Sequence, residues 1–254
     1  MLEIRNFSAG YDGKTVLRDI SLSVPEGKVT VIVGPNGCGK STLLKALTGI
    51  LPASGSASLD GRELLDLPGR ERARTVAFLP QNRSVPEISV KNLVLHGRFP
   101  YLSYPRRYRQ EDIRAAEDAM IRMGVAELSD RMLPTLSGGQ RQKVYIAMAL
   151  AQDTPVILLD EPNTFLDIAH QLQLMEQAKA LAAEGKTVVM VLHDLAMALG
   201  YADSLAVMDH GRCLTQGSAE EVFASGCLNV AFGVKICRIH TENGWKYYYE
   251  TGSS

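Results

Sequence analysis

Residues 34–41, with the sequence GPNGCGKS, constrain this chain more than any other stretch. They fit the pattern G-x-x-x-x-G-K-[ST] of a phosphate-binding loop, in which backbone N–H groups converge on phosphate oxygens. The β-branched run 29–33 precedes them and is typical of a strand buried on both faces, and a helix-like run 41–47 follows. The order strand, loop, helix predicts an α/β domain that binds phosphates, with Lys40 on the β- and γ-phosphates and the Ser41 hydroxyl on Mg²⁺.

Two acids, Asp160 and Glu161, follow directly after the apolar run 156–159. Solvated carboxylates often end a strand, so the pair alone would indicate little. Beside a phosphate-binding loop the pair gains meaning, because ligands bind outside the carboxyl ends of parallel strands. We therefore expect Asp160 on the metal side of the site and Glu161 as the group that orients or deprotonates an attacking water.

In the rest of the chain, the expected secondary structure changes from strands to helices and back to strands. Alternating apolar patterns predict short strands in the first part, at residues 2–4, 15–17 and 20–24. The middle is mostly helical in pattern, with helices expected at 111–123 and 140–152. Buried-strand patterns return at 156–159, 187–192 and 204–208, with a helix expected at 168–183. The tail alternates again at 234–236 and 245–249.

Composition limits the partners and the compartment. The 254 residues carry a formal net charge of -1, so no overall basic field favours nucleic acid or an anionic membrane. The apolar runs are far shorter than the ~20 residues that span a bilayer, and no signal peptide opens the chain. The four cysteines lack metal-ligand spacing, which favours reduced thiols. We expect a cytosolic protein.

Residues 136–140, with the sequence LSGGQ, form a second candidate anion site. Ser137 and two glycines present backbone N–H groups at the start of a helix. The pentapeptide is the signature of ABC (ATP-binding cassette) ATPases, and with the other motifs in this order the chain resembles that family over nearly its whole length. The resemblance implies a homodimer in which the signature of one copy closes over the γ-phosphate held by the other. The expected trans contacts to ATP are Ser137, Gly138, Gly139, Gln140 and Asp167.

The resemblance also implies the fold: α/β, a P-loop NTPase (RecA-like) core with an N-terminal antiparallel β subdomain and an inserted helical subdomain carrying the signature. We expect one cassette over residues 1–254. Its core comprises 1–82 and 152–220, its helical subdomain 83–151, and its C-terminal extension 221–254.

Family positions supply the remaining site residues, with ATP and Mg²⁺ as cofactors. Tyr11 matches the aromatic residue that stacks on adenine, Gln81 a glutamine that contacts Mg²⁺, and His193 a histidine that contacts the γ-phosphate. The expected cis ATP contacts are Tyr11, Gly34, Asn36, Gly37, Cys38, Gly39, Lys40, Ser41 and Thr42. The expected metal ligands are Ser41, Gln81 and Asp160, and the expected catalytic residues are Glu161, His193, Lys40 and Gln81.

Three residues of these motifs raise separate expectations. Asn163 stands where Thr or Ser is usual, and Phe165 where Ala, His or Tyr is common; both flank the loop at the dimer interface and could alter coupling between the sites. Cys38 lies near Lys40 and a helix N-terminus, both of which favour the thiolate. We expect alkylation of Cys38 to block ATP binding.

Several stretches resemble the ATPases of ferric-siderophore, haem and cobalamin importers, most clearly residues 97–100 and 166–171. The resemblance implies transmembrane permease subunits as partners, an extracytoplasmic substrate-binding protein as an indirect one, and a peripheral place at the cytoplasmic face of the inner or plasma membrane. In that family a groove after Gln81 takes a permease helix. Its candidate lining is Val85, Ile88, Val90, Leu93 and Val94, although ordinary core packing explains them equally well.

The alternative is a soluble ABC ATPase that acts on nucleic acid or ribosomes. Residues 49–136 lack the sustained heptads of DNA-organising ABC proteins, and the chain has one cassette where the ribosomal kinds have two. The basic and aromatic cluster within residues 98–109 could bind nucleic acid, but a solvated loop explains it more simply. We therefore expect no nucleic-acid partner.

Overall fold

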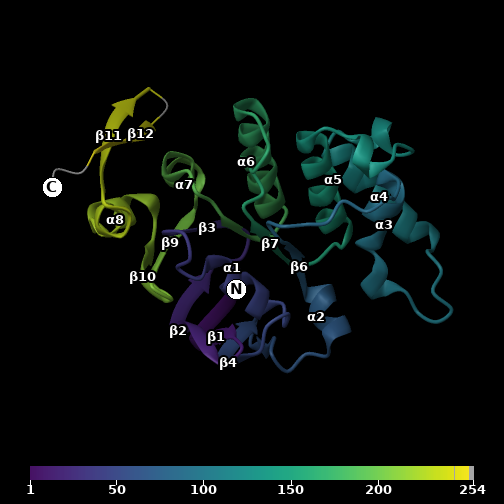
Figure 1. Cartoon of the computed structure of the whole chain (residues 1–254), viewed down its shortest axis with the longest axis horizontal. Helices are drawn as coiled ribbons and strands as arrows, with labels where there is room; N and C mark the ends of the chain where they lie inside the picture. Colours follow the sequence, from purple (N-terminus) through teal and green to yellow (C-terminus); the bar gives the residue numbers. More distant parts are fainter. Residues whose placement is uncertain (243, 252–254) are drawn as a thin grey trace.

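The computed structural model describes residues 1–242 and 244–251. Its centre is a six-stranded sheet in the order β10-β9-β3-β8-β7-β6 (Figure 1). Neighbouring strands are parallel except β10, which runs antiparallel to β9. The strands are β3 (Val29–Val33), β6 (Val76–Leu79), β7 (Val156–Asp160), β8 (Thr187–Val191), β9 (Ser204–Asp209) and β10 (Arg212–Gly217). The predicted buried strands are confirmed.

Other elements cover both faces of this sheet. Successive side chains of each strand point to opposite faces, so each strand contributes to two cores. Val31 and Val33 belong to a core shared with α5 (Gly138–Ala151) and α6 (Ile168–Ala183). Ile32 belongs to a second core, shared with α1 (Lys40–Leu47) and the N-terminal strands. Continuous apolar runs in the sequence follow from this burial on both sides.

A four-stranded antiparallel sheet, ordered β2-β1-β4-β5, forms the N-terminal subdomain. Its strands are β1 (Leu2–Tyr11), β2 (Lys14–Val24), β4 (Ala53–Leu59) and β5 (Arg62–Glu63). The two short strands expected at 15–17 and 20–24 are one strand. Register shifts interrupt its pairing with β1, where Asn6 and Asp19 adopt positive φ of 47° and 52°. These bulges break the apolar alternation without ending the strand.

Helices dominate the stretch between β6 and β7, at one end of the molecule (Figure 1). They are α3 (Val90–His96), α4 (Gln110–Arg122) and α5, with short 3₁₀ turns at Phe99–Tyr101, Ala126–Leu128 and Leu133–Thr135. The helix α2 (Gly69–Thr75) precedes β6. The expected groove lining is largely wrong: Val90, Leu93 and Val94 are buried in the core, and only Val85 is well exposed. Val90, Leu93 and Val94 lie on α3, which packs against α4 and α5.

The C-terminal part lies at the opposite end of the molecule (Figure 1). It comprises α7 (Leu195–Tyr201), α8 (Ala219–Ala224), α9 (Cys227–Phe232) and the hairpin of β11 (Val234–Thr241) and β12 (Gly244–Thr251). The alternation at 234–236 and 245–249 corresponds to this hairpin. No helix among the described residues is long and apolar enough to cross a membrane.

Candidate functional site: two half-sites on one chain

The loop between β3 and α1 has the backbone of a phosphate cradle. Gly37 and Gly39 adopt φ of 79° and 110°, a region that glycine enters without steric cost. Gly34 is needed for close approach, because a Cβ there would lie 2.1 Å from the carbonyl oxygen of Met208. Lys40 is 5% exposed, and its ammonium donates to the carbonyl oxygens of Gly34 at 2.7 Å and Pro35 at 2.9 Å. A buried cation and a glycine loop together suit an anionic ligand.

Asp160 and Ser41 meet at the edge of the parallel sheet. Asp160 ends β7 and is 1% exposed, and the Ser41 hydroxyl donates to its Oδ1 at 3.0 Å. Burial, together with the nearby Glu161 carboxylate, raises the pKa of Asp160. A hydroxyl and a buried carboxylate on one spot form the oxygen ligand set that Mg²⁺ prefers, and a bound cation would stabilise the charged carboxylate.

Glu161 is held from two sides. His193 Nε2 lies 2.5 Å from its Oε1, and the Gln81 amide donates to its Oε2. The three residues are distant in sequence but follow β6, β7 and β8, whose carboxyl ends share one edge of the sheet. The Glu161 backbone has φ of 50°, an uncommon value for a residue with a side chain.

These groups surround one hollow of about 330 Å³. Six of the nine expected cis ATP contacts line it, namely Asn36, Gly37, Gly39, Lys40, Ser41 and Thr42, and so do three expected catalytic residues, Gln81, Glu161 and His193. The expected residues Gly34, Cys38 and Asp160 are not part of this lining. Tyr11 stands outside it at the end of β1, 40% exposed, with its ring 5.9 Å from the Lys45 ammonium on α1. The loop and the strand edges therefore form one site.

The signature turn lies on a second, larger hollow of about 760 Å³. Ser137 caps α5, where its hydroxyl accepts from the Gln140 N–H at 3.2 Å and the Gln140 side chain accepts from the Ser137 N–H at 3.0 Å. The helix therefore begins at Gly138, two residues before the expected start. Asp167 caps α6 and accepts from the His170 N–H at 2.9 Å; this bond, with the His170 side chain, lowers the pKa of Asp167.

All five expected trans residues line this second hollow: Ser137, Gly138, Gly139, Gln140 and Asp167. Among the residues that the structure describes, none lines both this hollow and the one around Lys40. One chain therefore presents two distinct hollows, one around Lys40 and one around the signature turn.

The expectation that Cys38 favours the thiolate is wrong. Cys38 is 4% exposed, and burial raises the pKa of its thiol despite the nearby Lys40 ammonium. The loop folds this side chain inward against the sheet, so loss of hydration outweighs the attraction of Lys40.

One buried residue behind the site, Gln142, was not singled out by its sequence position, whereas Phe165 was. Gln142 on α5 is 2% exposed and bonds to both Arg83 and Pro162. A polar residue amid the apolar positions of a helix is the only sequence signal, and it does not name a partner. Phe165, beside Asn163, has φ of 67°, is 78% exposed and lies against Gly138.

Comparison with known proteins gives this geometry a family. Residues 17–164 match the family described as ABC transporter. The chain is 40% identical over 241 residues to the probable siderophore transport system ATP-binding protein YusV of Bacillus subtilis (strain 168), covering 94% of this chain and 87% of that protein. It is 42% identical over 229 residues to the ferric enterobactin transport ATP-binding protein FepC of Escherichia coli (strain K12), covering 89% and 84%.

A solved structure agrees with these relatives. The dimeric structure of MJ0796, a bacterial ABC transporter cassette, superimposes with a TM-score of 0.74 and 27% identity, covering 86% of this chain and 99% of that chain. The match over the phosphate loop, the signature and the acids after β7 shows that the chain belongs to the ABC transporter family, as an ATP-binding and ATP-hydrolysing cassette.

Proposed function

We propose that this chain is the ATPase subunit of a membrane importer and works as a head-to-tail homodimer. The observation that carries the proposal is the separation of the two half-sites, one around Lys40 and one around the signature turn. A second copy, turned by a two-fold axis, would supply the missing half of each site. MJ0796, a cassette of the same fold, was solved as a dimer.

In the proposed dimer, the side chains around Lys40 divide into phosphate-binding, metal-binding and catalytic groups. The Lys40 ammonium and the N–H groups of residues 34–42 bind the phosphates, while the partner's signature turn closes on the γ-phosphate. Ser41, Asp160 and Gln81 would hold Mg²⁺, which when bound neutralises phosphate charge. Glu161 orients or deprotonates the attacking water, and His193 fixes both Glu161 and the γ-phosphate.

The assignment of residues to a core and a helical subdomain supports the same mechanism. We assign residues 1–82 and 152–220 to the nucleotide-binding core, 83–151 to a helical subdomain and 221–254 to a C-terminal extension. Ser137 to Gln140 belong to the helical part and Lys40 to the core, so that dimer closure must bring parts of different subunits together. Hydrolysis that depends on closure can perform mechanical work on a partner.

We propose a permease as that partner, reached peripherally from the cytoplasmic face of the membrane. YusV and FepC are transport ATP-binding proteins for a siderophore and for ferric enterobactin. A siderophore, haem or cobalamin would then be the cargo, delivered through a substrate-binding protein. The nucleic-acid alternative receives less support, since Arg98 and Tyr101 of the basic cluster are engaged in internal contacts.

The test uses Glu161→Gln and Lys40→Ala. Glu161→Gln should retain ATP binding, abolish turnover and trap a dimer, because only the acid at the attacking water is lost. Lys40→Ala should weaken nucleotide binding itself. ATP binding, phosphate release and light-scattering mass are the measurements. A Glu161→Gln protein that turns over near the wild-type rate, or an ATP-loaded wild type that hydrolyses as a strict monomer, would contradict the proposal.

A further inference from the structure

Gln142 connects two segments of the nucleotide site through one buried amide. Its Oε1 accepts from Arg83 Nη2 at 2.6 Å, and its Nε2 donates to the Pro162 carbonyl at 2.5 Å. The side chain is 2% exposed, so water cannot replace either partner. Arg83 is two residues after Gln81, and Pro162 directly follows Glu161.

The Pro162 contact bears on the conformation of Glu161. Its φ of 50° is sparsely populated and persists only where surrounding contacts fix it. On one side the Glu161 N–H donates to the Val191 carbonyl at 3.2 Å. On the other side the Gln142 amide holds the Pro162 carbonyl. Gln142 is therefore one of the anchors that aim the Glu161 carboxylate.

The same residue stands on the helix that begins at the signature turn. Gln142 is four residues after Gly138, about one helical turn or 6 Å along α5. A hydrogen-bonded helix moves as a unit, so a displacement of the signature turn reaches Gln142 directly. From there it reaches Pro162 and, through Arg83, the loop that carries Gln81.

We infer that Gln142 is a positioning residue that couples the two nucleotide sites of the dimer. The inference rests on the proposed function, in which the signature of a chain serves one nucleotide and Glu161 of that chain serves the other. Closure of the signature turn on the first nucleotide then sets Glu161 for the second. Hydrolysis becomes cooperative because one helix belongs to both sites.

The experiment compares Gln142→Met and Gln142→Glu with the control Gln152→Met. The methionine removes both bonds. The glutamate can still accept from Arg83 but cannot donate to Pro162. Gln152 lies at the far end of the same helix, and its amide also donates to backbone carbonyls, those of Ala73 and Val76. Each variant is assayed at a temperature at which circular dichroism shows the native fold.

The readouts are kcat, the affinity for ATP and the Hill coefficient of ATP hydrolysis. Both Gln142 variants should lower kcat about tenfold to a hundredfold, the effect of misplacing a reacting group, with ATP affinity changed less than about twofold. The wild type should have a Hill coefficient above about 1 and at most about 2, because the dimer has two coupled sites. In both Gln142 variants the Hill coefficient should be close to about 1. Gln152→Met should retain the wild-type Hill coefficient.

Two results would overturn the inference and leave the proposed function standing. Active wild type together with Gln142 variants of unchanged kcat and Hill coefficient would leave only a structural role for Gln142. An equal loss of cooperativity in Gln152→Met would show a general effect of loosening α5. Wild type without ATPase activity, by contrast, would overturn the proposed function and this inference with it.

Discussion

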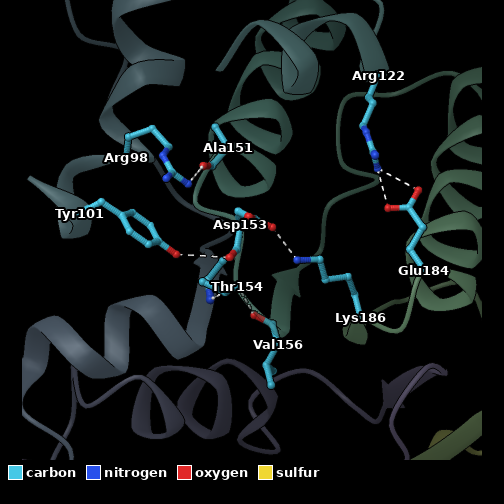
Figure 2. A network of polar contacts seen from close by, with 10 residues as sticks. Arg98, Tyr101, Arg122, Ala151, Asp153, Thr154, Val156, Glu184 and Lys186 are labelled. Atoms are coloured by element: carbon cyan, nitrogen blue, oxygen red, sulfur yellow. Dashed lines mark hydrogen bonds and ion pairs between the residues drawn. The ribbon is translucent and has the colours of Figure 1, made fainter. Parts of the chain in front are cut away.

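The ion pair of Arg98 and Asp112 makes a quantitative prediction about the helical part of the chain. Arg98 Nε lies 3.0 Å from Asp112 Oδ1, and the two side chains are only 10% and 3% exposed. Arg98 also donates to the Ala151 carbonyl at 3.0 Å, near the end of α5 (Figure 2), and stacks on the Tyr101 ring. In Arg98→Met the Asp112 carboxylate keeps the hydrogen bond from the Arg109 N–H at 2.9 Å but loses its counter-charge.

The magnitude follows from burial. Removing one partner of a buried pair leaves a charge without compensation and costs about 3–5 kcal/mol. For a chain of this size that cost corresponds to a fall in Tm of about 6–20 °C. Arg122 provides the matched control: it pairs with Glu184 (Figure 2) at 2.9 Å, but both side chains are about half exposed. Arg122→Met should therefore cost about 0–1 kcal/mol.

The assay is thermal and urea unfolding of both variants, followed by circular dichroism at constant protein concentration. The double variant Arg98→Met with Asp112→Leu should recover part of the stability that Arg98→Met loses, because it removes the isolated charge. Equal losses in Arg98→Met and Arg122→Met, or no recovery in the double variant, would refute the burial argument.

Two further predictions concern the nucleotide site and the dimer. Burial raises the pKa of Cys38, so its alkylation should be slow at pH 7, accelerate as pH rises and be prevented by ATP; full ATPase activity after modification would contradict this. Phe165→Ser in the Glu161→Gln background should weaken the ATP-bound dimer about tenfold or more, because an aromatic ring that is 78% exposed would be buried there. An unchanged dimer dissociation constant by light scattering would exclude that contact.

The sequence predicts well what short spacing determines. The buried strands and the helix at 168–183 follow from local patterns, and the structure confirms them. The glycine loop lies between a strand and a helix, as its pattern predicts. The site roles of Gln81 and His193 come from the family resemblance, and no strand is expected before Gln81. The structure groups them with Glu161 because the three residues follow β6, β7 and β8, which are neighbours in the sheet.

Other features depend on burial, which spacing alone cannot supply. Val90, Leu93 and Val94 have the composition of either a groove or a core, and only the packing of α3 against α4 and α5 places them in the core. For Cys38 the motif indicates nearby positive charge, but the inward turn of the side chain decides the direction of its pKa shift. The strand β2 has the sequence pattern of two strands because bulges interrupt its apolar alternation.

The backbone conformation of Glu161 is strained, and contacts behind this residue hold it in place. A φ of 50° at Glu161 is unfavourable by about 1–3 kcal/mol, and the bonds at Val191 and Pro162 must offset it. If the Glu161 backbone had an unstrained conformation, these bonds would not be needed. The position of the Glu161 carboxylate would then not depend on the position of α5. The strained conformation makes the position of Glu161 depend on Gln142, and hence on the signature turn. In the proposed dimer, this dependence would link hydrolysis to closure, because the Glu161 carboxylate is aimed only while the surrounding helices hold it.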